Sequence, residues 1–277
     1  MKLPPDAKPK ELIIKDLCLI KIGGSLITDK SRPYKARPKI IRQLAKEIKT
    51  VRGKGCYFLI AHGSGSFGHT SAAKYQTGEG IKNKKSLYGL AVVQQDAIKI
   101  NRIVNEIFLK EGLPCLSFVP SSFSLAKNKK LAKIFIEPIV ESLKIGILPL
   151  VFGDIILDKK RGCCIFSGES TLSNLIPPLI KAGFKINKII QCGTTDGVYD
   201  KNGKTIPLIT IGSFPRWEKA IAGAANTDVT GGMAHKLEES LKIAKRGIKT
   251  LIINGSKKGN LLRAVMSQRL RATIVQK

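Results

Sequence analysis

The amino-acid sequence predicts a three-layer α/β/α sandwich around a mostly parallel central sheet. Short apolar runs, typical of buried strands, alternate along the chain with longer stretches whose apolar residues recur at helical spacing. The chain has 277 residues and is 43% apolar, so it can bury a large core. No low-complexity linker or internal repeat interrupts the pattern. We therefore expect a single domain whose two lobes share one continuous sheet and meet between residues 168 and 185.

The first half of the chain contains four apolar runs separated by three amphipathic stretches. We expect strands over residues 17–22, 56–61, 115–119 and 147–152, and helices over residues 38–51, 86–110 and 137–143. The longest helix ends at Glu111-Gly112, and Pro114 follows, because glycine and proline terminate helices. Each helix lies between two strands, which is the order that a parallel sheet requires.

A β-hairpin is predicted in the middle of the chain. Its strands are residues 155–157 and 163–166, and the charged turn between them ends in Gly162. The alternation then resumes with helices over residues 170–182, 231–246 and 260–266, and strands over residues 188–192, 250–253 and 273–275.

The charge balance is strongly basic, with 48 Lys and Arg against 20 Asp and Glu and a formal net charge of +28. Such a surface attracts anions, nucleic acid included. The lysines are nevertheless spread through every predicted helix and loop, and only 6% of the residues are aromatic. No stripe of aromatic and basic residues of the kind that stacks bases is present. We expect a lysine-rich solvated surface, with nucleic acid an unlikely partner.

Several features of the sequence limit location and metal chemistry. No apolar run approaches the roughly 20 residues that cross a bilayer, so no membrane partner is expected. Residues 1–10 are rich in Pro and Lys and lack the apolar core of a secretion signal. The six cysteines form no Cys-x-x-Cys pair and lie mostly within apolar runs. This indicates buried thiols in a reducing cytoplasm, without a disulfide frame or a metal site.

Three separated segments couple glycines to a nearby Lys or His, and together they point to a polyanionic ligand. They are residues 21–25 (Lys-Ile-Gly-Gly-Ser), 62–69 (His-Gly-Ser-Gly-Ser-Phe-Gly-His) and 230–236 (Thr-Gly-Gly-Met-Ala-His-Lys). The second fits the Gly-x-Gly-x-x-Gly dinucleotide fingerprint, but no strand ending in an acidic residue follows about 20 residues later. No Gly-Lys-Ser/Thr closes it as in a Walker A loop. A phosphate site built from all three segments is the interpretation that we favour.

Three lysines supply positive charge to these segments. Lys21 ends an otherwise apolar strand, which is unusual unless it meets an anion; the alternative is an edge lysine that reaches solvent. Lys30 lies in a loop that could fold over the same place. Thr230 can cap a helix that begins at Gly231, whose free N–H groups would face a phosphate, with Lys236 about one turn further on. The alternative there is an ordinary helix cap followed by a surface lysine.

In this order the segments resemble the amino acid kinase superfamily and, within it, the isopentenyl phosphate kinases. The resemblance extends from Lys21 to the last predicted strand. Besides the glycine segments it includes Thr28-Asp29-Lys30, Gly153-Asp154, Ser167-Gly168, Thr195-Asp196-Gly197-Val198-Tyr199 and Asp228-Val229. The Ser-Phe-Gly-His ending of the second segment is its more specific part, because this family has a histidine there that contacts the acceptor phosphate.

The resemblance implies an amino acid kinase-like fold and a reaction. The γ-phosphoryl group of ATP would pass to isopentenyl phosphate, giving isopentenyl diphosphate for isoprenoid biosynthesis in the mevalonate pathway. Residues 1–170 would form the acceptor-binding lobe and residues 171–277 the nucleotide-binding lobe. Mg²⁺ would bridge the ATP phosphates mainly through substrate oxygens and water, so no metal ligands from the protein are expected. A cytoplasmic homodimer is the implied assembly.

The same resemblance implies roles for individual residues. The catalytic residues would be Lys21, Lys30, His69 and Lys236. The ATP site would comprise Lys21, Gly23, Gly24, Ser25, Gly65, Thr194, Asp196, Gly197, Gly231, Gly232 and Lys236. The acceptor site would comprise Gly63, Ser64, Gly68, His69, Gly153 and Asp154. Glu169 would orient the catalytic lysines. The family usually has two aspartates where Glu169 and Ser170 stand, and a serine cannot replace the second carboxylate.

Other residues near these motifs have two interpretations. His62 directly follows a strand and is expected to be structural, and His235 is expected to face solvent. Asp154 either shapes the acceptor pocket or starts the hairpin. The long helix could form the wall for an apolar substrate tail, although core packing would explain the same residues. The residues concerned are Leu90, Val92, Val93, Ile98 and Ile103.

Two other functions remain open from the sequence. A fosfomycin-type kinase, or another small-molecule kinase of the superfamily, could share the arrangement around His69. A non-catalytic nucleic-acid-binding protein on a kinase fold would explain the net charge of +28. The retained Lys21, Lys30, His69 and Lys236 argue against that second alternative.

Overall fold

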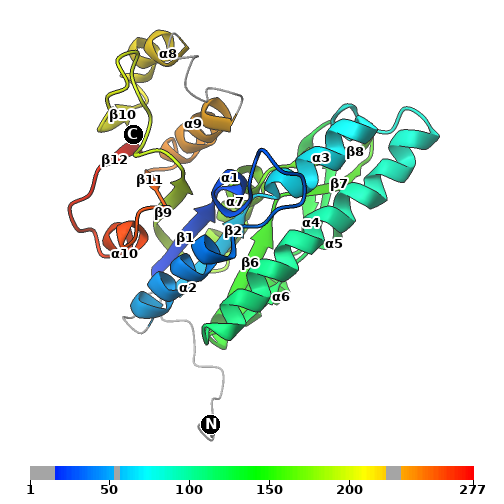
Figure 1. Ribbon diagram of the computed structural model, residues 1–277, viewed down its shortest axis with the longest axis horizontal. Coiled ribbons are helices and arrows are strands. Elements are labelled where there is room, and N and C mark those ends of the chain that lie inside the picture. The colour runs from blue at the N-terminus through cyan, green and yellow to red at the C-terminus, as the bar shows by residue number, and fades with distance from the viewer. Residues whose placement is uncertain (1–15, 53–56, 223–231) are drawn as a thin grey trace, which may run out of the picture.

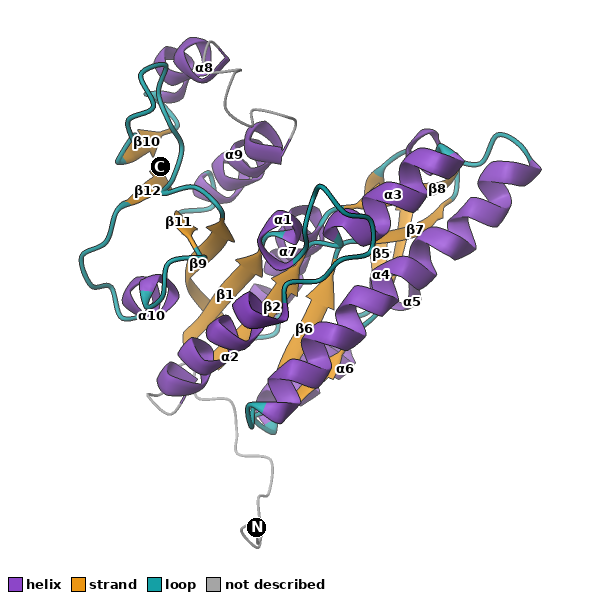
Figure 2. Ribbon diagram, in the orientation of Figure 1, coloured by secondary structure: helices purple, strands orange, loops and turns teal. Residues whose placement is uncertain are grey.

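A computed structural model describes residues 16–52, 57–222 and 232–277, and these residues form a three-layer α/β/α sandwich (Figures 1 and 2). The central sheet has eight strands among the described residues. Their order is β10 (Leu208–Thr210), β12 (Ala272–Gln276), β11 (Lys249–Asn254), β9 (Lys185–Gly193), β1 (Asp16–Ile22), β2 (Tyr57–His62), β6 (Leu148–Phe152) and β3 (Cys115–Ser117). The six strands from β11 to β3 are parallel, and β12 runs antiparallel to β11. The predicted fold class is confirmed.

Helices cover both faces of the sheet because each strand alternates its side chains between them. Cys18 and Ile20 of β1 pack toward α2 (Pro38–Arg52), α4 (Lys84–Lys110) and α10 (Asn260–Val265). Leu17 and Leu19 pack toward α6 (Glu137–Lys144), α7 (Gly168–Lys181) and α9 (Gly232–Ala244). Strands buried on both faces read as continuous apolar runs, which is why the sequence revealed them so clearly.

The predicted hairpin is present as β7 (Asp154–Asp158) and β8 (Gly162–Phe166), and it belongs to a second, four-stranded sheet. Its other strands, β4 (Ser124–Lys127) and β5 (Lys130–Ile134), were not predicted from the sequence. Asp158 joins the two hairpins: its carboxylate accepts N–H bonds from Asn128 and Lys129 in one turn and from Lys160 and Arg161 in the other. Although burial opposes it, these bonds hold the pKa of Asp158 well below its ordinary value.

Several further elements differ from the sequence prediction. The helices α1 (Gly24–Ile27), α3 (Gly65–Tyr75), α5 (Pro120–Phe123) and α8 (Phe214–Ala222), the 3₁₀ turn η1 (Thr77–Glu79) and the strand β10 were not predicted. α4 begins two residues early, at Lys84, because Asn83 and Ser86 form a reciprocal capping box. The predicted Cys56, Asp228, Val229, Thr230 and Gly231 lie outside the described residues.

Other expectations from the sequence concern cysteines, metals and membranes. Five cysteines lie within the described residues, and all five are buried. Across the described ranges, no three His, Cys, Asp or Glu side chains gather closely enough to ligate a metal ion. None of the described helices has the length and apolar content to cross a bilayer.

Candidate active site

The two N-terminal glycine segments meet where β1 and β2 end, and they touch backbone to backbone. A Cβ added to Gly24 would lie 2.5 Å from the Gly65 nitrogen, and one added to Gly63 would lie 2.7 Å from the Gly24 nitrogen. Gly65 also has a φ of +52°, which L side chains rarely adopt. Thr28 joins the loops further, since its Oγ1 donates to the Gly24 carbonyl at 2.7 Å and accepts the Ser66 N–H at 3.0 Å. These glycines are required by the packing of the loops themselves.

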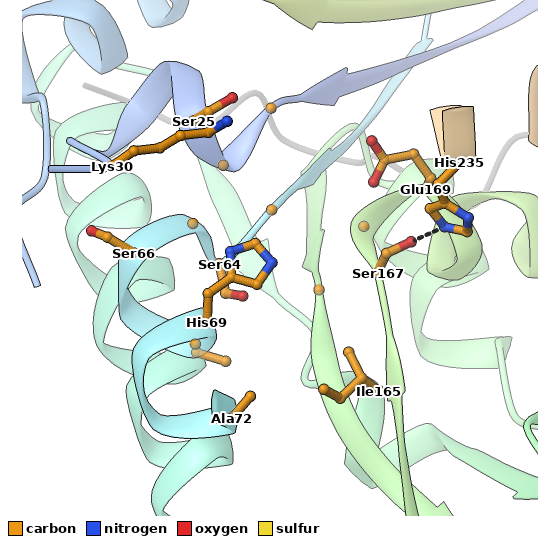
Figure 3. Close-up of a pocket in the computed structure, with 18 of the residues that line it drawn as sticks. Ser25, Lys30, Ser64, Ser66, His69, Ala72, Ile165, Ser167, Glu169 and His235 are labelled. Carbon is orange, nitrogen blue, oxygen red and sulfur yellow. Dashed lines mark hydrogen bonds between the residues drawn. The ribbon is translucent and has the colours of Figure 1, made fainter. Parts of the chain in front are cut away.

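A cavity of about 800 Å³ opens beside this loop contact (Figure 3). Most of the residues predicted for the site line it. They are Lys21, Gly23, Gly24, Ser25, Lys30, Gly63, Ser64, Gly65, Gly68, His69, Gly153, Asp154, Glu169, Thr194 and Lys236. Two other predicted residues, Asp196 and Gly197, are not among the described residues that line the cavity. Gly231 lies outside the described residues, and Gly232 is described only as the first residue of α9. Segments from both ends of the chain therefore meet around one cavity.

Two lysines from opposite ends of the chain influence one carboxylate in this cavity. Lys21 is only 4% exposed and forms an ion pair with Glu169, which lies in the first turn of α7. Burial disfavours the ionised carboxyl, but Lys21 and then Lys236 hold the pKa of Glu169 below its ordinary value. Burial and the neighbouring Lys21 lower the pKa of Lys236 to about 8. The cavity thus has an excess of positive charge that an anionic ligand would neutralise.

The strand behind Lys236 leaves just enough room for its side chain. A Cβ on Gly193, at the end of β9, would lie 3.2 Å from the Lys236 Nζ atom. A methyl group there would require the ammonium group to shift by a few tenths of an ångström. Asp196, a few residues later, is instead paired with Lys257 at 2.7 Å, and its buried Oδ1 atom has no hydrogen-bond partner among the described residues.

The three histidines have different environments. His69 projects from α3 into the cavity, where burial, Lys30 and Lys21 lower the pKa of its imidazole (Figure 3). His62 is fully buried, bonds Asn101 and the Gly63 carbonyl at 3.1 Å each, and stacks on Phe152. Burial lowers the pKa of His62 to about 4. These contacts fit the structural role expected for His62.

The expectation for His235 was wrong. It was expected to face solvent, but it lines the cavity, and its Nε2 atom lies 2.8 Å from the Ser167 hydroxyl. A helix starting near residue 231 can turn this position either way, so the sequence contained no signal for its direction.

Asp154 both starts β7 and lines the cavity, so the two interpretations of this residue are compatible. It is 3% exposed, and its carboxylate accepts the N–H groups of Ser121 at 2.9 Å and of Ile155 at 2.8 Å. Burial raises the pKa of Asp154 despite these bonds.

One part of the cavity wall is apolar. Ala72 of α3, Val93 and Ala97 of α4, and Ile165 and Phe166 of β8 form this wall. Of the five residues that the sequence suggested for such a wall, only Val93 lines the cavity. Leu90 packs beside Val93 in a small cluster, and Ile103 packs against the main core. Ala97 was missed, although its spacing of four from Val93 places it on the same helix face.

Lysines and glycine loops gathered at one end of parallel strands are typical of phosphate-handling enzymes. Comparison with known proteins shows to which family of such enzymes the chain belongs. The sequence pattern described as "Amino acid kinase family" matches residues 16–254. The chain therefore belongs to the amino acid kinase family and is a phosphotransferase.

Individual relatives narrow this further. The isopentenyl phosphate kinase of Methanothermobacter thermautotrophicus is 34% identical over 93% of this chain and 98% of its own length. That of Methanocaldococcus jannaschii is 29% identical over 91% of this chain and 96% of its own. A solved structure described as "X-ray structures of isopentenyl phosphate kinase" superposes with a TM-score of 0.78 at 28% identity, over 93% of this chain and 99% of that one. Within the amino acid kinase family, this chain belongs to the isopentenyl phosphate kinases.

Proposed function

We propose that this protein transfers the γ-phosphoryl group of ATP to isopentenyl phosphate, forming isopentenyl diphosphate and ADP. The observation that supports it most is the gathering of Lys21, Lys236 and His69 around one cavity that also has an apolar wall. The relatives with the highest similarity described above have the same named activity.

The reaction joins two anions, so charge neutralisation is its main requirement. In the proposed arrangement Lys21, Lys30 and Lys236 neutralise the ATP phosphates and the moving phosphoryl group, and His69 binds the acceptor phosphate. An acceptor oxygen attacks the γ-phosphorus as the bond to the ADP oxygen breaks. A phosphate monoester loses its second proton at a pKa near 6, so the attacking oxygen needs no strong base.

Glu169 has an orienting role in this proposal. Its carboxylate pairs with Lys21 and attracts Lys236, so it holds two cations that would otherwise repel one another. The backbone N–H groups of the glycine loops supply the remaining donors to the phosphates.

The apolar wall identifies the class of acceptor. Ala72, Val93, Ala97 and Ile165 line the same cavity as His69, so a short branched hydrocarbon tail could lie against them while His69 binds its phosphate. An amino acid acceptor would instead need partners for an ammonium and a carboxylate group, and this wall offers none. A fosfomycin-type acceptor is smaller and more polar, and it would leave much of the wall uncovered.

The remaining assignments complete the proposal. Residues 1–170 are the acceptor-binding lobe and residues 171–277 the nucleotide-binding lobe, in which Thr194, Asp196 and Gly197 lie near the nucleoside. In this proposal Mg²⁺ is held mainly by ATP oxygens and water and would reduce the charge of the phosphates. We place the enzyme in the cytoplasm, in isoprenoid synthesis from mevalonate, as a homodimer that does not use nucleic acid as a partner.

A coupled ADP-release assay tests the proposal with isopentenyl phosphate, dimethylallyl phosphate, fosfomycin, uridylate and acetylglutamate. We expect isopentenyl phosphate to give the highest kcat/KM. His69→Ala should lower kcat/KM by about 100-fold or more while leaving ATP affinity nearly unchanged, because it removes a donor to the reacting phosphate. Lys74→Ala, an exposed change on the same helix, is the matched control. Normal turnover by His69→Ala would contradict its role. Retention on DNA at physiological salt without any ATP turnover would favour the nucleic-acid alternative.

A further inference from the structure

His235 joins the beginnings of two helices that each contain a charged residue of the site. It lies in the first turn of α9, directly before Lys236. Its Nε2 atom is 2.8 Å from Ser167 Oγ (Figure 3). The same atom is 3.3 Å from Ser170 Oγ, and the two serines flank Glu169 at the start of α7. Side-chain hydrogen bonds therefore connect the helix of Lys236 to the helix of Glu169.

The hydrogen bonds in this cluster are mutually compatible. Ser167 is the N-cap of α7, and its Oγ accepts the Ser170 N–H at 3.0 Å. The Ser167 hydroxyl donates to Ser170 Oγ at 3.1 Å. Ser167 Oγ still has a second lone pair, and an imidazole protonated at Nε2 can donate to it across the 2.8 Å contact. Loss of the imidazole would leave the helix cap in place, so the contact can be removed without removing the N-cap of α7.

The position of Lys236 depends on how α9 lies against α7. Lys236 and Glu169 attract one another, and each shifts the pKa of the other. Glu169 is in turn paired with Lys21. A displacement of the first turn of α9 would therefore change the spacing of both lysines around the carboxylate. Small misplacements of groups that act on a reacting atom can cost about 100-fold in rate.

Ser170 gives the contact its particular chemistry in this chain. A serine stands at the second position after Gly168, and its short hydroxyl leaves room for an imidazole between α7 and α9. We propose that His235, together with Ser170, is a positioning residue for phosphoryl transfer, which fixes the first turn of α9 against the N-terminus of α7 and so sets the place of the Lys236 ammonium. This inference rests on the proposed transfer of phosphate from ATP in this cavity.

The test compares His235→Ala, His235→Gln, Ser170→Ala and the double variant His235→Ala/Ser170→Ala in the full chain. We expect His235→Ala to lower kcat roughly 10- to 100-fold, with the KM values for ATP and acceptor changed less than about threefold. Glutamine can place an amide group near Ser167, so His235→Gln should recover most of kcat. The double variant should be no slower than His235→Ala, because both changes break one interaction. Glu238→Ala, exposed on the same helix, is the control.

The other outcomes contradict the inference. An unchanged kcat in His235→Ala would overturn it, and so would a loss that appears only in KM for ATP, which would make His235 a direct nucleotide ligand. Additive losses in the double variant would show that the two residues act separately. If His235→Ala unfolds, the kcat of Ser170→Ala and His235→Gln decides the question, with full loss in His235→Gln counting against the proposal.

The assay separates this inference from the proposed function. It is run with whichever acceptor of the panel the unchanged protein uses fastest, and ATP affinity is measured by calorimetry without acceptor. If isopentenyl phosphate is not the preferred acceptor, the proposed function fails while the kcat comparison among the variants still stands.

Discussion

Lys236 shows how the site modifies the properties of a single side chain. Its ammonium group lies among other cations in a partly closed cavity, and burial followed by Lys21 lowers its pKa to about 8. A bound polyphosphate would reverse the lowering of this pKa by Lys21, since a nearby anion favours the charged amine. The free protein therefore holds Lys236 partly neutral near pH 8, and ATP should restore its proton.

Proton uptake measures this effect. At pH values well below the Lys236 pKa of about 8 the amine is already charged, so ATP binding at pH 6.5 should take up almost no proton. At pH 8 it should take up as much as roughly half a proton. Calorimetry in two buffers of different ionisation enthalpy gives the number of protons directly. Lys236→Met should abolish the uptake at pH 8, whereas Lys245→Met, exposed further along the chain, should retain it. Equal uptake in Lys236→Met would assign the proton to another group.

At the scale of elements, the contact between the start of α1 and the start of α3 positions the glycine loops that line the cavity. Gly24 and Gly65 lie so close that a methyl group on Gly24 would meet two backbone atoms within 2.7 Å. Backbone on both sides cannot yield as a flexible side chain would. The pair of loops therefore has one relative position, and Lys21, Ser25 and His69 depend on it.

Gly24→Ala tests this dependence. We expect a loss of about 2 kcal/mol or more in the free energy of unfolding, measured in urea, together with weaker ATP binding. Gly212→Ala is the matched control, since among the described residues its Cβ would meet only Thr210 Oγ1, at 4.0 Å. That control should change the free energy of unfolding by less than about 1 kcal/mol. Similar effects from both changes would mean that glycine flexibility, and not the loop contact, explains the loss.

Three elements, α3, β4 and β5, were not predicted from the sequence pattern. The helix α3 has the sequence Gly-Ser-Phe-Gly-His-Thr-Ser at its start, which favours a loop by propensity, yet packing against α4 and the loop of Gly24 makes it helical. β4 and β5 were missed because lysines occupy their exposed positions and the strands are short. In both places tertiary contacts outweigh local preference.

For the whole molecule, the sheet edge formed by β3 offers a surface for the proposed homodimer. β3 is the last strand of the sheet, and Leu116 on it is 46% exposed. Leu109, at the end of α4, and Ile145, after α6, are exposed as well. An edge strand that exposes an apolar side chain is a common site of association.

Light scattering during size-exclusion chromatography measures the assembly. We expect a mass twice the chain's 30.2 kDa at moderate salt, because salt reduces the repulsion between two strongly basic chains. Leu116→Lys should shift the protein toward the monomer, while Leu208→Lys, at the opposite edge of the sheet, should leave the dimer intact. Dissociation by Leu208→Lys alone would move the interface to the β10 edge, and a monomeric unchanged protein would remove the homodimer from the proposal.

The sequence by itself determined the three-layer fold and the alternation of parallel strands and helices along the chain. The reason is that the spacing of apolar residues within a segment is a local property that can be read without knowing the tertiary structure. It also identified the glycine segments and most residues that line the cavity. Only the tertiary structure decided which of those glycines touch, that Val93 and Ala97 form the apolar wall, and that His235 turns inward to Ser167. The physical reason is that the direction of a side chain depends on how its helix is rotated against its neighbours, and packing between distant segments sets that rotation.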